Sequence, residues 1–222
     1  RQRQMCIRDM CSEILIKNLV HISALFVAER HNSLYMQSKL QGEKNILENF
    51  SSSIILRPSI IFGPGEKFFN TFATLAQFSP IIPLIGGGKT KFAPIYVGDV
   101  AKAIVKSLEL NNSEPKIYEL GGPKIISFGD MVKSIMETIG KKRFVIGMPM
   151  SIAKIQSTLL SLLPFPPILT RDQCEILTEA DNVVSNNELD IKDLNINPKD
   201  VEEKMSTWLY RYRSGGQFAK VK

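Results

Sequence analysis

The sequence predicts an α/β fold, namely the C-terminal portion of a doubly wound parallel sheet together with a smaller mixed α/β domain. Strand-like and helix-like segments alternate along the chain, which is typical of parallel strands joined by crossover helices. A buried strand at 54–57 leads directly into a Pro/Gly loop at 58–65, as expected where a parallel sheet ends over a ligand. The chain has 222 residues, 44% of them hydrophobic, which is enough for one core or a core and a half.

Each element follows from local signals. The helix expected at 33–49 places Leu34, Leu40, Ile46 and Leu47 on its inner side. Residues 127–130 resemble a capping box for a helix that ends at 139, and Pro198 occupies the permitted first position of a last helix to about 213. Further helices are expected at 68–78, 98–110 and 151–163 and from 170, with strands at 18–23, 54–57, 92–97, 116–120 and 144–146.

A glycine-rich stretch at 86–90 looks like the tail of a phosphate-binding P-loop. That motif requires a glycine where Pro83 stands and a helix directly after Thr90, where the sequence is strand-like. We therefore expect this stretch to turn a hairpin.

Composition and charge exclude several classes of protein. No apolar run reaches the ~18 residues of a membrane span, and no signal-peptide pattern is present. The cysteines, Cys6, Cys11 and Cys174, have no metal-binding spacing, so we expect reduced thiols, no metal and a cytoplasmic or equivalent reducing compartment. The net charge is +6, but lysines and acids are interspersed, so we expect no nucleic-acid partner.

Tyr35 and Lys39 stand four residues apart on the helix expected at 33–49. This spacing puts both side chains on one face, one turn apart. An ammonium beside a phenol favours the phenolate, so the tyrosine pKa is expected to fall toward the working pH, and the Ser23 hydroxyl could polarise a substrate carbonyl. The same spacing also occurs on solvated helices, so by itself it leaves both interpretations open.

An ordered set of motifs carries a family resemblance. The motifs are, in order, Ser23, Tyr35-x-x-x-Lys39, Leu56-Arg57-Pro58 with Phe62-Gly63-Pro64, Tyr96-Val97-Gly98-Asp99-Val100-Ala101 and Tyr118-Glu119-Leu120-Gly121-Gly122. This set resembles the extended and atypical short-chain dehydrogenase/reductase superfamily, of the NAD-dependent epimerase/dehydratase type, which implies a Rossmann-like sheet. Residues 84–90, 169–173 and 181–185 are similar to one branch, the NADPH-binding accessory subunit of respiratory complex I and its bacterial relatives.

The resemblance implies a site for NADP or NAD. Ser23 matches the catalytic serine, Tyr35 the catalytic tyrosine, and Lys39 the lysine that hydrogen-bonds the nicotinamide ribose. Pro58, Ser59 and Ile60 match the loop under the nicotinamide ring, so Tyr35, Lys39 and these three residues are the predicted cofactor contacts. Simpler structural roles are also open to Ser23 and to three further polar residues. Ser23 could instead bond to backbone, and we favour an ion pair for Arg57, a helix cap for Asp99 and a packed strand position for His21.

The resemblance also sets the expected domain boundaries. No Gly-x-Gly-x-x-Gly turn precedes Ser23, so we expect a C-terminal fragment that lacks the pyrophosphate half of the cofactor site. Residues 10–62 and 98–122 are assigned to the remnant of the NAD(P)-binding domain, and 63–97 and 123–213 to the smaller substrate-type domain. Residues 1–9 are arginine-rich and judged extraneous, and 214–222 form a tail.

The leading functional hypothesis is a nucleotide-holding accessory or assembly subunit of NADH:quinone oxidoreductase. In typical extended members of the superfamily that this chain resembles, a long loop between the serine and the tyrosine helps to shape the sugar-binding cleft. The short segment 25–34 at that place therefore disfavours sugar-nucleotide epimerisation. The alternatives are an active NAD(P)-dependent oxidoreductase or epimerase, and a cofactor-free interaction module. The expected partners are complex I subunits near the quinone site. Residues 151–169 are expected to touch a membrane surface, so the chain could be peripheral on the inner membrane or on its matrix side.

Overall fold

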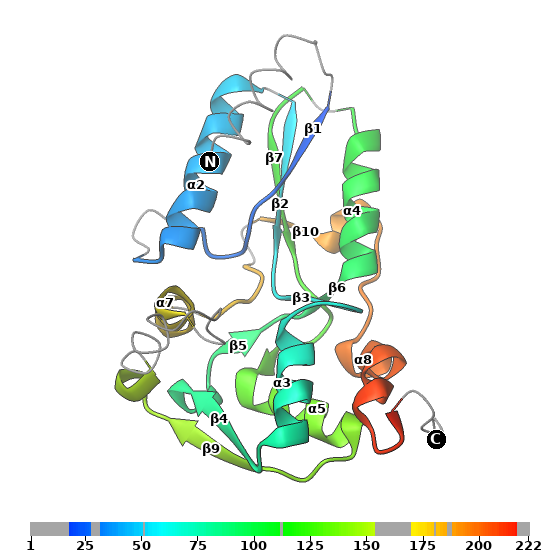
Figure 1. Ribbon diagram of the computed structural model, residues 1–222. Coiled ribbons are helices and arrows are strands. Elements are labelled where there is room, and N and C mark those ends of the chain that lie inside the picture. Colours follow the sequence, from blue (N-terminus) through cyan, green and yellow to red (C-terminus); the bar gives the residue numbers. More distant parts are fainter. Residues whose placement is uncertain are drawn as a thin grey trace.

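The computed structural model describes residues 18–27, 32–50, 52–111, 113–153, 170–179, 181–185 and 188–216. Figure 1 shows two lobes: an upper one in which a sheet lies between helices α2 and α4, and a lower one built around α3, α5 and α8. Within the described ranges, no helix is long and apolar enough to cross a membrane, and no group of three potential metal ligands is present.

The upper lobe contains a four-stranded sheet in the order β1-β2-β7-β10. Its strands are β1 (Leu19–Ile22), β2 (Ser53–Pro58), β7 (Lys116–Leu120) and β10 (Leu189–Asp190), and every neighbouring pair is parallel. Helix α2 (Leu34–Asn49) joins β1 to β2, and α4 (Val97–Glu109) covers the opposite face (Figure 1). The predicted fold class, a Rossmann-like parallel sheet with helices, is confirmed.

The side chains of β2 divide between the two faces of this sheet, as the period of two requires. Ile54 and Leu56 pack with Val100 and Ala103 of α4 in one buried cluster. Arg57 points to the other face, where it meets Glu43 of α2. A strand covered on both faces explains why 54–56 is a continuous aliphatic run.

The lower lobe has its own core, formed by α3 (Phe68–Phe78), α5 (Phe128–Ile139) and α8 (Val201–Leu209). Trp208 and Phe62 stack with ring centroids 6.1 Å apart, and Phe68, Phe72 and Phe128 continue the aromatic contacts. Short strand pairs surround this core: β3 (Ile61–Phe62) with β6 (Ile95–Tyr96), β4 (Ile81–Ile85) with β9 (Phe144–Met148), and β5 (Lys91–Phe92) with β8 (Ile126–Ser127).

Most predicted helices begin and end within a residue of their observed bounds. Ser127 caps α5 by accepting from the Asp130 amide at 3.1 Å, and Gly140 ends that helix in the left-handed conformation. The last helix begins at Val201 after the cap Asp200, so the predicted start at Pro198 is wrong by three residues. Leu34 is 74% exposed, so its predicted place on the inner side of α2 is also wrong.

The glycine-rich stretch does not turn a hairpin. Gly86–Gly88 forms a short 3-10 turn, η1, but β4 before it pairs in parallel with β9, and β5 after it pairs with β8. Three successive glycines with positive φ make the turn so tight that β4 and β5 leave it toward different partners.

The domain division stays a prediction, and one segment lies elsewhere than expected. β10 and the 3-10 turn η2 (Ile191–Leu194) were assigned to the smaller domain, but they extend the sheet and fill its α4 side. Residues 1–9, 154–169 and 217–222 lie outside the described residues, so the expectations placed on them stay untested.

Candidate functional site

The candidate site begins where β1 ends. Ser23 is the residue after that strand, and its amide donates to the Leu56 carbonyl at 2.7 Å, which fixes the backbone against β2. The side chain is 3% exposed, and its hydroxyl has no hydrogen-bond partner in the described part of the chain. The alternative in which backbone satisfies this hydroxyl is therefore wrong for this arrangement. A buried, unpartnered hydroxyl is a group that a bound ligand could satisfy.

Helix α2 brings Tyr35 and Lys39 to the same strand end. The Lys39 ammonium donates to the carbonyl of Ile22, the residue before Ser23, at 3.0 Å. The same nitrogen lies 5.7 Å from the centroid of the Tyr35 ring. The structure thus places Lys39 near Tyr35, as the spacing of four residues predicts, and also against the Ile22 carbonyl, which the spacing did not predict.

The predicted lowering of the tyrosine pKa is wrong in this arrangement. Burial raises the pKa of Tyr35 above its ordinary value of 10.0. Burial also lowers the pKa of Lys39 below 10.5, and the Glu43 carboxylate partly opposes that change. Tyr35 is therefore a neutral phenol at pH 7, a hydrogen-bond donor and a weak base.

The first turn of α2 is held by a residue that the sequence analysis missed. The carboxylate of Asp172, on α7 (Arg171–Glu179), accepts from the Leu34 amide at 2.7 Å and from the Ser33 hydroxyl at 3.0 Å. The Ser33 oxygen in turn accepts from the Met36 amide at 3.3 Å, so Ser33 is the N-cap. Negative charge at a helix N-terminus is stabilising. Nothing in the spacing of 33 and 172 could have revealed this contact.

A buried ion pair fixes α2 to β2 one turn after Lys39. Arg57 donates from Nε and Nη2 to the two Glu43 carboxylate oxygens at 3.0 and 2.6 Å. Glu43 is 2% exposed, and the paired carboxylate raises the pKa of Arg57. The structural interpretation of Arg57 is confirmed.

His21 packs in β1 opposite Ile55, and its Nε2 atom is buried without a hydrogen-bond partner among the described residues. Burial and, secondarily, the nearby Lys39 charge lower its pKa below 6.5. This placement agrees with a packed strand residue.

The loop at Pro58, Ser59 and Ile60 lies at the carboxyl end of β2, but its polar groups bond within the chain. The Ser59 hydroxyl lies 2.6 Å from Asn182 Oδ1 and 2.9 Å from the Asn182 carbonyl oxygen. The Ser59 amide donates to the Leu120 carbonyl, and the Ile60 carbonyl accepts from the Ile95 amide. These bonds hold the loop in place, and its contact with a nicotinamide ring stays a prediction.

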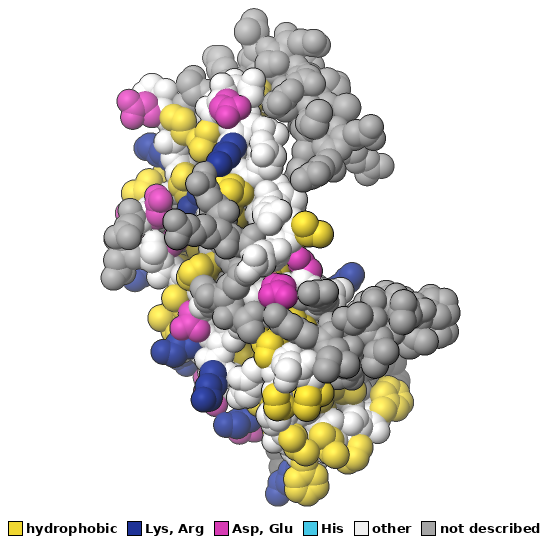
Figure 2. All heavy atoms as spheres, turned by 90° about the vertical axis from the view of Figure 1, so that its left-hand side faces the viewer, with side chains coloured by type: hydrophobic (Ala, Val, Ile, Leu, Met, Phe, Trp, Pro, Cys, Tyr) yellow, Lys and Arg dark blue, Asp and Glu magenta, His cyan; other side chains and the backbone are white. Residues whose placement is uncertain are grey.

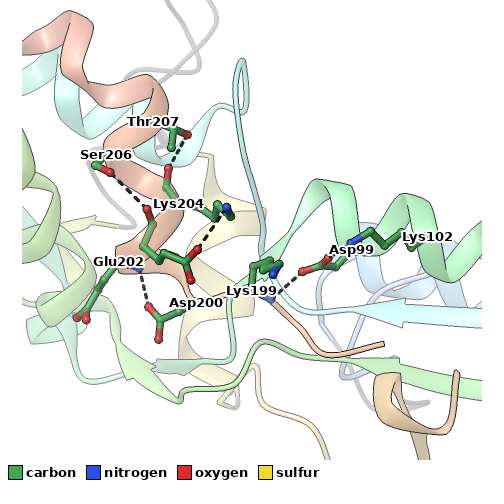
Figure 3. Close-up of polar contacts among 9 residues, drawn as sticks. Asp99, Lys102, Lys199, Asp200, Glu202, Lys204, Ser206 and Thr207 are labelled. Carbon is green, nitrogen blue, oxygen red and sulfur yellow. Dashed lines mark hydrogen bonds and ion pairs between the residues drawn. The ribbon is translucent and has the colours of Figure 1, made fainter. Parts of the chain in front are cut away.

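Asp99 lies in the first turn of α4 but does not cap it. The residue before the helix is Tyr96, which makes no side-chain cap. The fully buried Asp99 carboxylate instead accepts from the Lys199 amide at 2.7 Å and pairs with Lys102 at 3.1 Å (Figure 3). The expected cap is therefore wrong, because the carboxylate joins α4 to the chain leading into α8.

The described residues fit half of a dinucleotide site. Lys39 and Tyr35 supply donors, Ser23 supplies a buried hydroxyl, and all three belong to adjacent segments at the carboxyl end of a parallel sheet, where such folds bind nucleotides. The fold and this residue set define a Rossmann-like protein of the short-chain dehydrogenase type.

The family follows from sequence comparison. The chain belongs to the 3-beta hydroxysteroid dehydrogenase/isomerase family, whose family model matches residues 8–118. The expected superfamily is thereby confirmed.

Individual relatives are more specific. The chain is 31% identical over 210 residues to NADH dehydrogenase [ubiquinone] 1 alpha subcomplex subunit 9, mitochondrial, of Arabidopsis thaliana, covering 90% of this chain and 52% of that protein. The protein of the same name from Mus musculus is 30% identical over 209 residues, with 94% of this chain and 55% of that protein covered. The chain spans about half the length of these relatives.

Solved structures show the same fold. dTDP-glucose 4,6-dehydratase from Bacillus anthracis, in complex with NAD, matches with a TM-score of 0.66 and 17% identity over 94% of this chain and 66% of that one. MoeE5, in complex with UDP-glucose and NAD, matches with a TM-score of 0.67 and 14% identity over 93% of this chain and 68% of that one.

Proposed function

We propose that this chain is part of an accessory subunit of an NADH:quinone oxidoreductase, respiratory complex I, that binds a nicotinamide dinucleotide mainly for structural reasons. The observation that carries the proposal is the match of at least nine tenths of the chain to relatives named as a subunit of that enzyme. The arrangement of Ser23, Tyr35 and Lys39 supports the nucleotide part of the proposal.

In this proposal Lys39 and the Tyr35 hydroxyl bind the nicotinamide ribose, Ser23 satisfies a polar group of the nicotinamide half, and Pro58, Ser59 and Ile60 lie under the ring. The cofactor, NADP or NAD, would supply hydride-transfer chemistry. The raised pKa of Tyr35 keeps the phenol protonated at neutral pH, so it can donate a hydrogen bond to the bound nucleotide.

An exposed apolar face supports a role within an assembly. Phe78, Ile81, Phe144 and Ile146 are 85, 46, 76 and 51% exposed, and the β4–β9 register places Ile81 beside Phe144. Figure 2 shows hydrophobic side chains gathered at this end of the molecule. Apolar patches of this kind mark interfaces. We infer that complex I subunits, near the quinone site, cover this face, and that the segment 151–169 contributes membrane contact on the matrix or cytoplasmic side.

A second candidate function is an active NAD(P)-dependent oxidoreductase or epimerase. It is favoured by the unpartnered Ser23 hydroxyl, which follows the Ile22 carbonyl that Lys39 binds, since an active site of this class needs such a donor next to the reacting carbonyl.

The two candidates are separated by Tyr35→Phe in the full-length protein, expressed in a host from which the gene has been deleted. We expect the variant to restore complex I assembly as the wild type does, because the Tyr35 hydroxyl is one of several contacts to the nucleotide and Lys39 retains its own. Normal assembly in the deletion strain would refute the accessory role. A hydride-transfer activity that Tyr35→Phe lowers by about a hundredfold or more would instead establish the enzyme.

A further inference from the structure

A groove with lysines on both walls lies away from the nucleotide site. It has a volume of about 590 Å³ and runs between α4 and the segment 195–199 that leads into α8. Lys102 and Lys106 stand on the α4 wall and Lys199 on the opposite wall. Figure 3 shows Lys102 and Lys199 on either side of Asp99.

The groove is held open by bonds within the chain. The buried Asp99 carboxylate accepts hydrogen bonds from the Lys199 amide and the Lys102 ammonium, so it fixes the distance between the two walls. Asn195, in the left-handed conformation, ends η2 and turns the chain along α4. The shape of the groove therefore exists before any partner binds, which lowers the conformational entropy cost of binding.

The charge of the groove is unbalanced. The Lys106 and Lys199 ammonium groups have no partner in the described part of the chain, and the Lys102 side chain is 60% exposed although paired. The buried Asp99 carboxylate offsets the charge of Lys102, and the lining itself offers one exposed carboxylate, Glu109, against Lys106 and Lys199. The groove therefore favours a negatively charged occupant.

The remaining lining favours a peptide over a small anion. Val105, which also lines the groove, is 56% exposed, and the exposed amide side chains of Asn195 and Asn197 can bond to a peptide backbone. Lys102 and Lys106 are spaced by about 6 Å along α4. A phosphate site would require donors that converge on one point, which lysines spread along a helix and across a groove do not supply.

We propose that this groove binds an acidic segment of a partner protein, with carboxylates facing Lys102, Lys106 and Lys199 and a small apolar side chain on Val105. The surface is separate from the strand-end site, so the proposal holds whether or not the chain binds a nucleotide.

Zero-length carbodiimide cross-linking of the full-length protein in its native host, followed by mass spectrometry, tests the proposal. Lys102, Lys106 or Lys199 should link to Asp or Glu residues of one identified protein. If that protein is not a complex I subunit, the proposed function fails while the groove proposal stands. Links only within the chain would overturn the groove proposal.

The linked peptide, synthesised and fluorescently labelled, then serves as the probe. Lys106→Glu combined with Lys199→Glu should weaken its binding by about tenfold or more, and the remaining affinity should lose most of its salt dependence. Val105→Glu, which changes no lysine, should weaken it comparably. Lys142→Glu makes the same charge change at an exposed site on the lower lobe and should have little effect. Equal binding by all variants, or equal binding of a sequence-scrambled peptide, would overturn the proposal, as would full competition by millimolar inorganic phosphate.

Discussion

Replacing Glu43 with Gln should destabilise the protein strongly, because it leaves Arg57 without its anion. The Glu43 side chain is 2% exposed and the Arg57 side chain 16% exposed, so water can replace the carboxylate only in part, and Glu119 and Glu188 act on Arg57 by charge alone. Breaking a buried ion pair by removing one partner costs about 3–5 kcal/mol. For a chain of this size, about 2–4 °C of melting temperature is lost per kcal/mol, so a fall of roughly 6–20 °C is expected.

Urea and thermal unfolding of the full-length protein would measure this effect. Lys133→Gln is the matched control, because it breaks an ion pair whose side chains are both more than 60% exposed, and the unfolding midpoint should barely move. A double variant, Glu43→Gln with Arg57→Met, should recover part of the loss by removing the uncompensated charge. A loss below about 1 kcal/mol in the single variant would refute the claim that this pair fixes α2 to the sheet.

Three further predictions concern single positions, each followed by urea unfolding. Gly122→Ala should lower the free energy of unfolding by about 1–3 kcal/mol, because the new Cβ would overlap the Pro94 carbonyl oxygen. Gly147→Ala, whose Cβ would make only an ordinary contact to Gly87, is the control and should have a small effect; equal effects of the two variants would contradict the packing. Burial raises the pKa of Glu66 above 4.5, so the folded state binds that proton more tightly than the unfolded state, and the free energy of unfolding should fall as the pH rises through the folded pKa. Glu66→Gln should abolish this fall, and an unchanged pH profile in the variant would contradict the assignment to Glu66. The pKa of His21 is lowered from 6.5 in the folded state, so the unfolded state binds the proton at higher pH, and the free energy of unfolding should decrease as the pH drops below about 6.5. His21→Gln should remove this decrease, and a decrease that persists in the variant would belong to another group.

The sequence predicted the parallel core well because its signals are local. Aliphatic residues 54–56 are buried on both faces, and Ser127 and Gly140 mark the ends of α5 by hydrogen bonding and backbone conformation. These features depend on residues a few positions apart, so the pattern alone locates them. The proximity of Tyr35 and Lys39 was likewise predictable, because residues four positions apart on one helix lie on the same face.

What the sequence could not supply are contacts between distant segments. Asp172 bonds to Ser33 and Leu34 across 139 and 138 positions, and Asn182 secures Ser59 across 123. The tyrosine pKa was misjudged for a related reason. Its direction depends on how deeply the phenol is buried, and burial is a property of the fold that the spacing to Lys39 does not contain.

The central claim, that Lys39 and its neighbours hold a nicotinamide dinucleotide, is tested most directly by calorimetric titration of the full-length protein with NADPH and with NADH. The wild type and Lys44→Met, an exposed lysine on the same helix, should bind one of the two nucleotides with equal affinity. Lys39→Met should weaken that binding by about tenfold or more, since a hydrogen bond to a charged group contributes about 1.5–3 kcal/mol. Absence of binding to the wild type, or an unchanged dissociation constant in Lys39→Met, would contradict the account.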